Sequence, residues 1–208
     1  MPPALFSDDK SAVKKLLVIF LLAAGIWYCL HDPAAAWRGI PAAHDPVQTS
    51  GPLPAPFVHE GLTITPLATY KISAVVLSRS RYRYDTVAPF APVDLALGWG
   101  PMSIASVINQ LHISQSGRWY EYSYSSDPPL EPAEIARHSA NTHCLPADPD
   151  VRRSLLAVKR HELVTLEGYL VDVSRSNGYR WHSSLTRDDT GGGACEVMWI
   201  TRIDHRAL

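Results

Sequence analysis

Cys195, His138 and His143 are the residues of this chain best suited to catalysis. Cys195 follows a glycine-rich loop over residues 190–193, whose backbone N–H groups could bind an oxyanion. With a histidine as general base, its thiol would be the nucleophile of a hydrolase. However, Cys195 lies at the start of an alternating apolar run, which indicates a buried side chain. We therefore take these three as catalytic candidates and favour a protein without catalytic activity.

The same histidines form a poor metal site. His138 and His143 are five residues apart, which separates them by about 140° on a helix and places them on opposite faces of a strand. Zinc requires ligands converging at about 2.0 to 2.3 Å. Only a loop that also brought in Cys144, or Asp188 and Asp189, would meet this requirement. We expect no metal and no cofactor.

Cys144 and Cys195 either form a disulfide or remain free thiols. In an oxidising compartment they could form a disulfide, and closing a loop of about 50 residues would stabilise the domain by about 2 to 4 kcal/mol. Alternatively, both are independent buried thiols, because each has apolar neighbours and a free cysteine packs as a small apolar residue.

Binding is indicated by arginines and tryptophans. Arg79, Arg81 and Arg83 alternate, which places three guanidinium groups on one strand face. This face is either simply solvated or binds an anionic partner. Trp119 and Trp181, if exposed, would favour protein recognition. Nineteen basic and twenty acidic residues give no strongly positive field, so we expect no nucleic-acid partner.

Strand patterns dominate the part of the chain that must position these residues. β-Branched and alternating apolar residues predict strands over 70–78, 94–99, 162–173, 179–185 and 194–203, a hairpin over 112–124, and short helices over 103–110, 131–137 and 148–158. The last three strands read as a meander, with a bend or bulge at Gly168. The predicted fold is mostly β (α+β): a small curved sheet or partly closed OB-like barrel with two or three short helices.

An uncharged apolar run covers residues 16–30 and follows Lys14 and Lys15. At about 1.5 Å per residue it spans about 22 Å, less than the hydrocarbon core of about 30 Å. It is therefore either an uncleaved signal anchor, which we favour, or a signal peptide cleaved after Ala36. The lysine bias predicts a bacterial inner-membrane protein with a cytoplasmic N-terminus and a periplasmic C-terminal domain.

The predicted organisation has four parts. Residues 1–15 are the cytoplasmic segment and 16–30 the transmembrane helix. Residues 31–66, rich in proline and alanine, are a spacer, because proline favours an extended and semi-rigid chain. The alternative is that this stretch is an irregular part of the domain. Residues 67–208 form the β-rich periplasmic domain.

Five strings carry a resemblance to known sequences. They are ALGWGPMS (96–103), ISQSGRWYEY (113–122), RHSANTH (137–143), PADPDV (146–151) and SSLTRDDTGGGACE (183–196). On these strings the chain resembles uncharacterised bacterial membrane-anchored envelope proteins of unassigned function. The resemblance implies a membrane-attached domain and transfers no catalytic residue.

Together these features predict a membrane-anchored periplasmic interaction or assembly module without catalytic activity. Its partners would be the membrane, crossed by a single span, and other envelope proteins. Two alternatives remain open: an envelope thiol hydrolase that uses Cys195 with a histidine, and a small-ligand-binding barrel.

Overall fold

The computed structural model describes residues 14–23, 40–189 and 191–208, within two compact units, Met1–Ala35 and Ala36–Leu208. In the first unit, residues 14–23 are helical. Among the described residues, no helix has both the length and the apolar character needed to cross a membrane. The rest of the predicted 16–30 span, and Ala36, lie outside the described residues.

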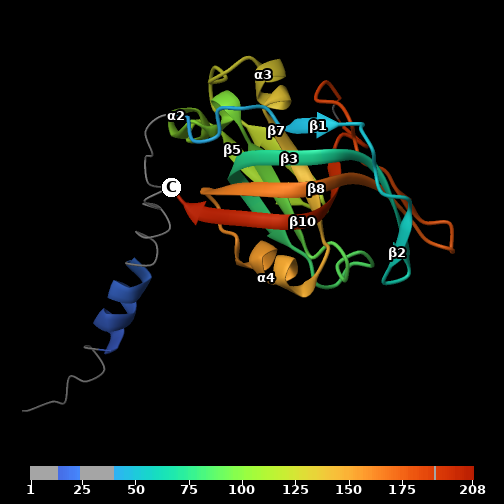
Figure 1. The fold of residues 1–208 in the computed structure, drawn as a ribbon. Coiled ribbons are helices and arrows are strands. Elements are labelled where there is room, and N and C mark those ends of the chain that lie inside the picture. Colours follow the sequence, from blue (N-terminus) through green and yellow to red (C-terminus); the bar gives the residue numbers. More distant parts are fainter. Residues whose placement is uncertain (1–13, 24–39, 190) are drawn as a thin grey trace, which may run out of the picture. The chain divides into compact units, whose positions relative to one another are not determined.

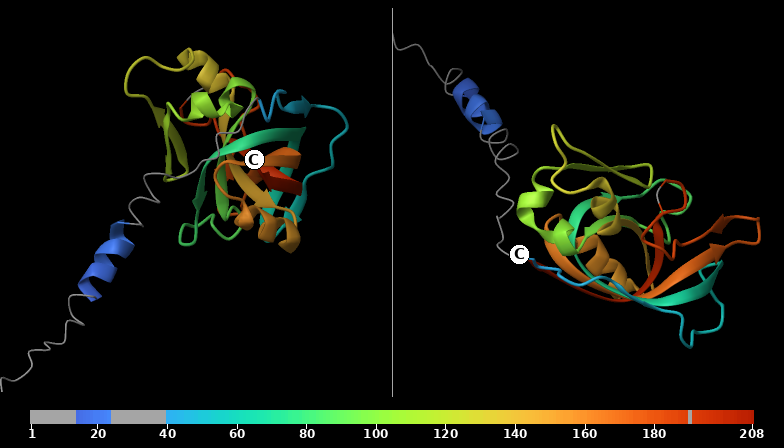
Figure 2. Two further views of the ribbon diagram at one scale, coloured as in Figure 1. Left: turned by 90° about the vertical axis from the view of Figure 1, so that its left-hand side faces the viewer. Right: turned by 90° about the horizontal axis from the view of Figure 1, so that it is seen from above.

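Five strands of the second unit close on themselves through their hydrogen bonds (Figures 1 and 2). They are β3 (Leu62–Arg81), β4 (Val93–Gly98), β7 (Ser139–Pro146), β10 (Glu196–Ala207) and β8 (Glu162–Ser174), named in the order of pairing. β8 pairs with β3, which completes the circuit; only the β7–β10 pair among these five is parallel. The prediction of a mostly β chain with a few short helices is confirmed.

The remaining strands and helices lie outside the five-strand circuit. They are β1 (Val47–Thr49), β2 (Phe57–His59), β5 (His112–Ser116), β6 (Trp119–Ser123), β9 (Arg180–Trp181), the 3₁₀ helix η1 (Gly100–Ser103), α2 (Ala105–Ile108), α3 (Pro132–Arg137) and α4 (Pro149–Ala157). β1 and β2 pair with β3, and β9 pairs with β8. β5 and β6 form a separate hairpin.

The barrel interior is closed at one end by α4. Leu155 of this helix packs with Leu95 and Met198 in the main apolar core. Asp148 caps the helix, because its carboxylate accepts hydrogen bonds from the backbone N–H groups of Asp150 and Val151. α3 lies toward the opposite end (Figure 1).

The predicted meander is wrong. β9 and β10 both pair with β8, at different stretches: Trp181 lies opposite Val173, and Met198 lies opposite Leu170. Only two residues of the predicted 179–185 strand have strand structure. The segment after them has no strand structure. It lies beside the start of β10, since Ser183 Oγ accepts a hydrogen bond from the backbone N–H of Val197 and the Ser184 N–H donates to the Cys195 carbonyl.

The β-rich unit begins before residue 67, contrary to the predicted spacer over 31–66. β1 and β2 lie inside that stretch, and β3 begins at Leu62. Extended, proline-rich backbone suits short edge strands as well as a linker, so composition did not separate the two. Residues 31–39 lie outside the described residues.

Gly168 allows β8 and β10 to approach closely, as the predicted bend requires. A Cβ atom at this position would collide with the carbonyl oxygen of Trp199. That oxygen belongs to the backbone of the paired strand and has little room to move.

We therefore expect Gly168→Ala to lower the free energy of unfolding by about 1 to 3 kcal/mol, the usual effect of overpacking. Urea unfolding of the full chain measures the change. Gly51→Ala is the control, because no atom lies within 4 Å of a Cβ at Gly51. Equal stability of the two variants would contradict the close approach.

Candidate functional site

The candidate site lies on the outer face of β4 and β7. Asp94 and His143 are opposite each other in the β4–β7 pair. Their neighbours Val93, Leu95 and Cys144 point into the barrel core, so alternation directs Asp94 and His143 outward. Both side chains are nevertheless buried, because other segments fold over this face.

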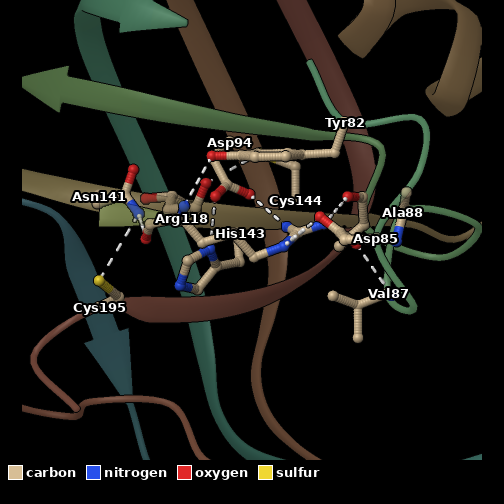
Figure 3. Close-up of polar contacts among 12 residues, drawn as sticks. Tyr82, Asp85, Val87, Ala88, Asp94, Arg118, Asn141, His143, Cys144 and Cys195 are labelled. Atoms are coloured by element: carbon tan, nitrogen blue, oxygen red, sulfur yellow. Dashed lines mark hydrogen bonds and ion pairs between the residues drawn. The ribbon is translucent and has the colours of Figure 1, made fainter. Parts of the chain in front are cut away.

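Arg118, at the turn of the β5–β6 hairpin, supplies the main cover (Figure 3). Its Nη1 donates to Asp94 Oδ1 at 3.0 Å, and its Nε and Nη2 donate to the two carboxylate oxygens of Asp85 at 3.1 and 3.0 Å. Nη2 also donates to the Ala91 carbonyl, and the guanidinium stacks 4.0 Å from the Tyr82 ring centroid. The guanidinium is thus held on several sides.

These contacts explain the backbone of the hairpin turn. Gly117 and Arg118 both have positive φ, 56° and 68°, as a two-residue turn between twisted strands requires. This conformation is unfavourable for arginine. The Arg118 backbone N–H donates to the Tyr82 hydroxyl at 3.0 Å, and this bond, with the ion pairs, compensates for the strain.

Asp85 is held in its charged form by Arg118. Partial burial would raise the pKa of this carboxyl, but hydrogen bonds and charge from Arg118, together with backbone N–H groups of Val87 and Ala88, lower it below its usual value. The ion pair between Asp85 and Arg118 therefore holds the Asp85 loop against the hairpin.

His143 lies between a carboxylate and an aromatic ring. Its Nδ1 is 2.9 Å from Asp94 Oδ2, in an arrangement too bent for a good hydrogen bond, and its ring centroid is 4.5 Å from that of Trp181. Nδ1 is therefore the ring nitrogen that faces Asp94. Nε2 points away from Asp94 in Figure 3.

Cys195 is positioned by an amide. Asn141 Nδ2 donates to Cys195 Sγ at 3.6 Å and to the Arg118 carbonyl at 3.0 Å, while Asn141 Oδ1 accepts from Gln115 at 2.7 Å. Burial raises the pKa of Cys195 to about 11, in spite of the Asn141 hydrogen bond. Within the described residues, no histidine hydrogen-bonds this sulfur. At neutral pH the thiol is protonated and a weak nucleophile.

Two cavities meet at this site. One, of about 360 Å³, is lined by residues that include Arg118, His143, Tyr179, Arg180 and Trp181. The other, of about 280 Å³, is lined by residues that include Tyr120, Tyr122, Asn141 and Asp189. Trp119 and Cys195 line both cavities. We call the combined depression the Trp119 groove.

The structure brings together four of the predicted site residues. Cys195, His143, Trp119 and Trp181 all line the Trp119 groove. His138 does not: it ends α3, lines a different cavity, and its Nδ1 lies 2.9 Å from the Glu134 carbonyl oxygen. Of the two candidate histidines, only His143 shares a cavity with Cys195.

The predicted arginine face keeps only two of its three residues on a strand. β3 ends at Arg81, so Arg83 lies in the following loop and not on the strand. Arg79 is partly buried and donates to the Val158 carbonyl oxygen. The alternation in the sequence continues past the point where the strand ends, so the three guanidinium groups do not share one face.

Cys144 and Cys195 are both free thiols, and the disulfide considered above is not formed. β7 and β10 run parallel, with Met198 opposite Cys144. Cys195 is three residues before Met198, a displacement of about 10 Å at about 3.3 Å per residue. A disulfide requires Cα atoms within about 7 Å, so this register excludes it.

Sequence reasoning missed Asp94, Arg118 and Asn141. The available signal was a charged residue inside the otherwise apolar run VDLALG, residues 93–98. A carboxylate in a fully buried strand needs a charged partner, but nothing local identifies it. In the described part of the chain, no three His, Cys, Asp or Glu side chains are placed to hold a metal ion.

Comparison with known proteins returned no match: no family model fits the chain, and no curated protein or solved structure is significantly similar to it.

Removing the central carboxylate tests the network. Asp94→Ala leaves Arg118 and His143 without their shared buried partner, so we expect a loss of about 3 to 5 kcal/mol in unfolding free energy, measured by urea denaturation. The control is Asp204→Ala, whose pair with Arg202 is exposed and should contribute less than about 1 kcal/mol. A similar small loss for both would contradict a structural role for Asp94.

The raised pKa of Cys195 predicts slow alkylation. Because only the thiolate reacts, the rate of Cys195 alkylation by iodoacetamide should rise about tenfold per pH unit from pH 7 upward, followed by peptide mass spectrometry. Cys144, fully buried, should react only after unfolding and serves as the internal control. A Cys195 rate that is already maximal at pH 7 would mean an activated nucleophile.

Proposed function

We propose that this chain is a membrane-anchored periplasmic interaction module that binds an extended segment of another envelope protein in the Trp119 groove. The observation that carries the proposal is the position of Trp119. Its side chain is 51% exposed, and it lies where two cavities join. Exposed tryptophans beside concave surfaces are typical anchors of protein recognition.

We further propose that the barrel is of the OB type. Three features support this: the closed five-strand circuit, its single parallel pair, and the position of α4 between the third and fourth barrel strands. OB folds bind ligands on the face of their second and third strands and on adjoining loops. Here those strands correspond to β4 and β7, which carry Asp94 and His143.

The hydrogen bonds already made by the polar side chains of the groove favour a protein partner over a glycan. Arg118 and Asn141 already hydrogen-bond to other protein groups, so they have little capacity left for sugar hydroxyls. Three aromatic side chains contribute apolar surface to this cavity: Trp119, Tyr179 and Trp181. Exposed Arg180 at the edge would pair with an acidic residue. A segment with apolar side chains and one carboxylate fits this chemistry.

The membrane anchor and the compartment are proposed from the sequence. The apolar run over 16–30, with Lys14 and Lys15 before it, supports insertion with the N-terminus in the cytoplasm. On this proposal, the groove faces the periplasm, where its partner would be another envelope protein.

A thiol hydrolase is the second candidate. One observation favours it: Asp94 lies beside His143, and His143 lines the same cavity as Cys195. A carboxylate, an imidazole and a thiol are therefore present in one region. The raised pKa of the thiol and the absence of a histidine hydrogen bond to it among the described residues weigh against this candidate.

Site-specific photocrosslinking in membranes tests the binding proposal. A photoreactive phenylalanine at position 119 of the full chain should crosslink to an apolar segment of an envelope protein that contains an acidic residue. The same group at position 58 is the control and should not, because Val58 is 73% exposed but lies on β2, outside the groove.

The affinity for that segment, made as a peptide, should fall at least tenfold in Trp119→Ala and stay unchanged in Val58→Ala. Equal crosslinking at both positions, or competition by cell-wall glycan fragments but not by the peptide, would refute the proposal. Cleavage of the peptide by the native chain but not by Cys195→Ser would establish the hydrolase instead.

A further inference from the structure

A third cavity, of about 310 Å³, lies at the end of the barrel opposite α4. Its lining includes Tyr70, Trp99, Leu185 and Arg187. Tyr70 and Trp99 belong to the main core, which α4 closes from the other end. The cavity is therefore the mouth of the barrel, and neither Trp119 nor Cys195 lines it.

Three buried polar atoms beside this mouth have no hydrogen-bond partner within the described part of the chain. They are Tyr70 Oη, Arg187 Nη2 and Glu196 Oε2. Tyr70 is 3% exposed and Glu196 is 1% exposed. Arg187 and Glu196 use their other polar atoms on each other, since Arg187 Nη1 forms an ion pair with Glu196 Oε1. An unsatisfied buried polar group costs about 1 to 3 kcal/mol, so three in one place point to a missing binding partner.

Two of the three groups are donors. Burial raises the pKa of Tyr70 well above its ordinary value, so its hydroxyl keeps its proton. The Arg187 guanidinium lies 6.0 Å from the Tyr70 ring centroid, and its Nη2 can only donate. Two donors on adjacent side chains suit the two oxygens of one carboxylate.

The other residues that line the cavity indicate the chemistry of the rest of the ligand. Trp99 and Leu185 offer apolar surface, and Trp99 Nε1 is already bonded to Asp45 Oδ1 at 3.2 Å. Arg137 at the rim is paired with Asp188 at 3.0 Å. The cavity volume is at the lower end of small-molecule sites. The occupant is therefore small, with one anionic end and an apolar body.

We propose that the barrel mouth binds a small organic carboxylate with an apolar body, whose carboxylate accepts hydrogen bonds from Tyr70 Oη and Arg187 Nη2. This site is separate from the Trp119 groove and does not depend on the function proposed for it. Free organic acids and the C-terminal carboxylate of a peptide share this chemistry.

The neighbouring Glu196 is compatible with an anionic ligand. Burial raises the pKa of Glu196 to about 7, more than the opposing effect of Arg187 lowers it. Near neutral pH this carboxyl is therefore protonated in a large fraction of molecules, which reduces its repulsion of a bound carboxylate and its hold on Arg187.

Calorimetric titration of the full chain in detergent tests the site. The probes are 3-phenylpropionate as a free acid and N-acetylphenylalanine as a peptide C-terminus; the tighter binder identifies the source. 3-Phenylpropionamide, which lacks the charge, should bind at least tenfold more weakly than the free acid.

Tyr70→Phe is the decisive variant, because it removes only the unpartnered hydroxyl. We expect about tenfold weaker binding of the tighter acid, with an unchanged or higher melting temperature in the absence of ligand. Tyr120→Phe is the matched control: its hydroxyl donates to Ser139 Oγ at 3.2 Å, outside the barrel mouth, and its loss should leave the affinity unchanged. Equal binding of acid and amide, no binding of either acid, or full affinity in Tyr70→Phe would overturn the proposal.

Discussion

The fully buried carboxylate of Asp94 is the constraint on which the candidate site depends. A charge in the interior is tolerated only with charged and hydrogen-bonding partners around it. Asp94 has such a partner in Arg118, and His143 lies beside its other carboxylate oxygen. These partners come from the β5–β6 hairpin and from β7. The hairpin and the Asp85 loop are therefore held over β4 and β7 by electrostatics, and the Trp119 groove takes its shape from that arrangement.

The arginine and amide groups of this network are engaged within the protein, although Asp94 Oδ2 and His143 Nδ1 have no hydrogen-bond partner among the described residues. The Arg118 guanidinium binds two carboxylates and a carbonyl. Asn141 uses its amide on the Arg118 carbonyl and on the Cys195 sulfur, and the Cys195 thiol has a raised pKa. What faces outward is the aromatic surface of Trp119 and its neighbours. This division, with polar groups used for structure and aromatic groups for contact, supports binding better than catalysis.

The two ends of the barrel differ in whether their buried polar groups have hydrogen-bond partners. At one end α4 packs apolar residues into the core and has its N-terminus capped by Asp148. At the other end Tyr70, Arg187 and Glu196 leave polar atoms without partners within the described residues. A buried ion pair that is only partly hydrogen-bonded contributes little to stability; on our proposal, its role is to bind a carboxylate ligand.

The sequence by itself determined the local features of this protein. The β-rich composition, the β5–β6 hairpin and the Asp148 cap of α4 all follow from residues a few positions apart. Tertiary structure alone decided the parallel pairing of β7 with β10, which separates Cys144 from Cys195. It also decided the meeting of Asp94, Arg118 and His143. A charge within an apolar strand shows that a partner must exist, but the partners are distant along the chain. Only the pairing of β4 with β7 and the packing of the β5–β6 hairpin over them bring these partners into contact.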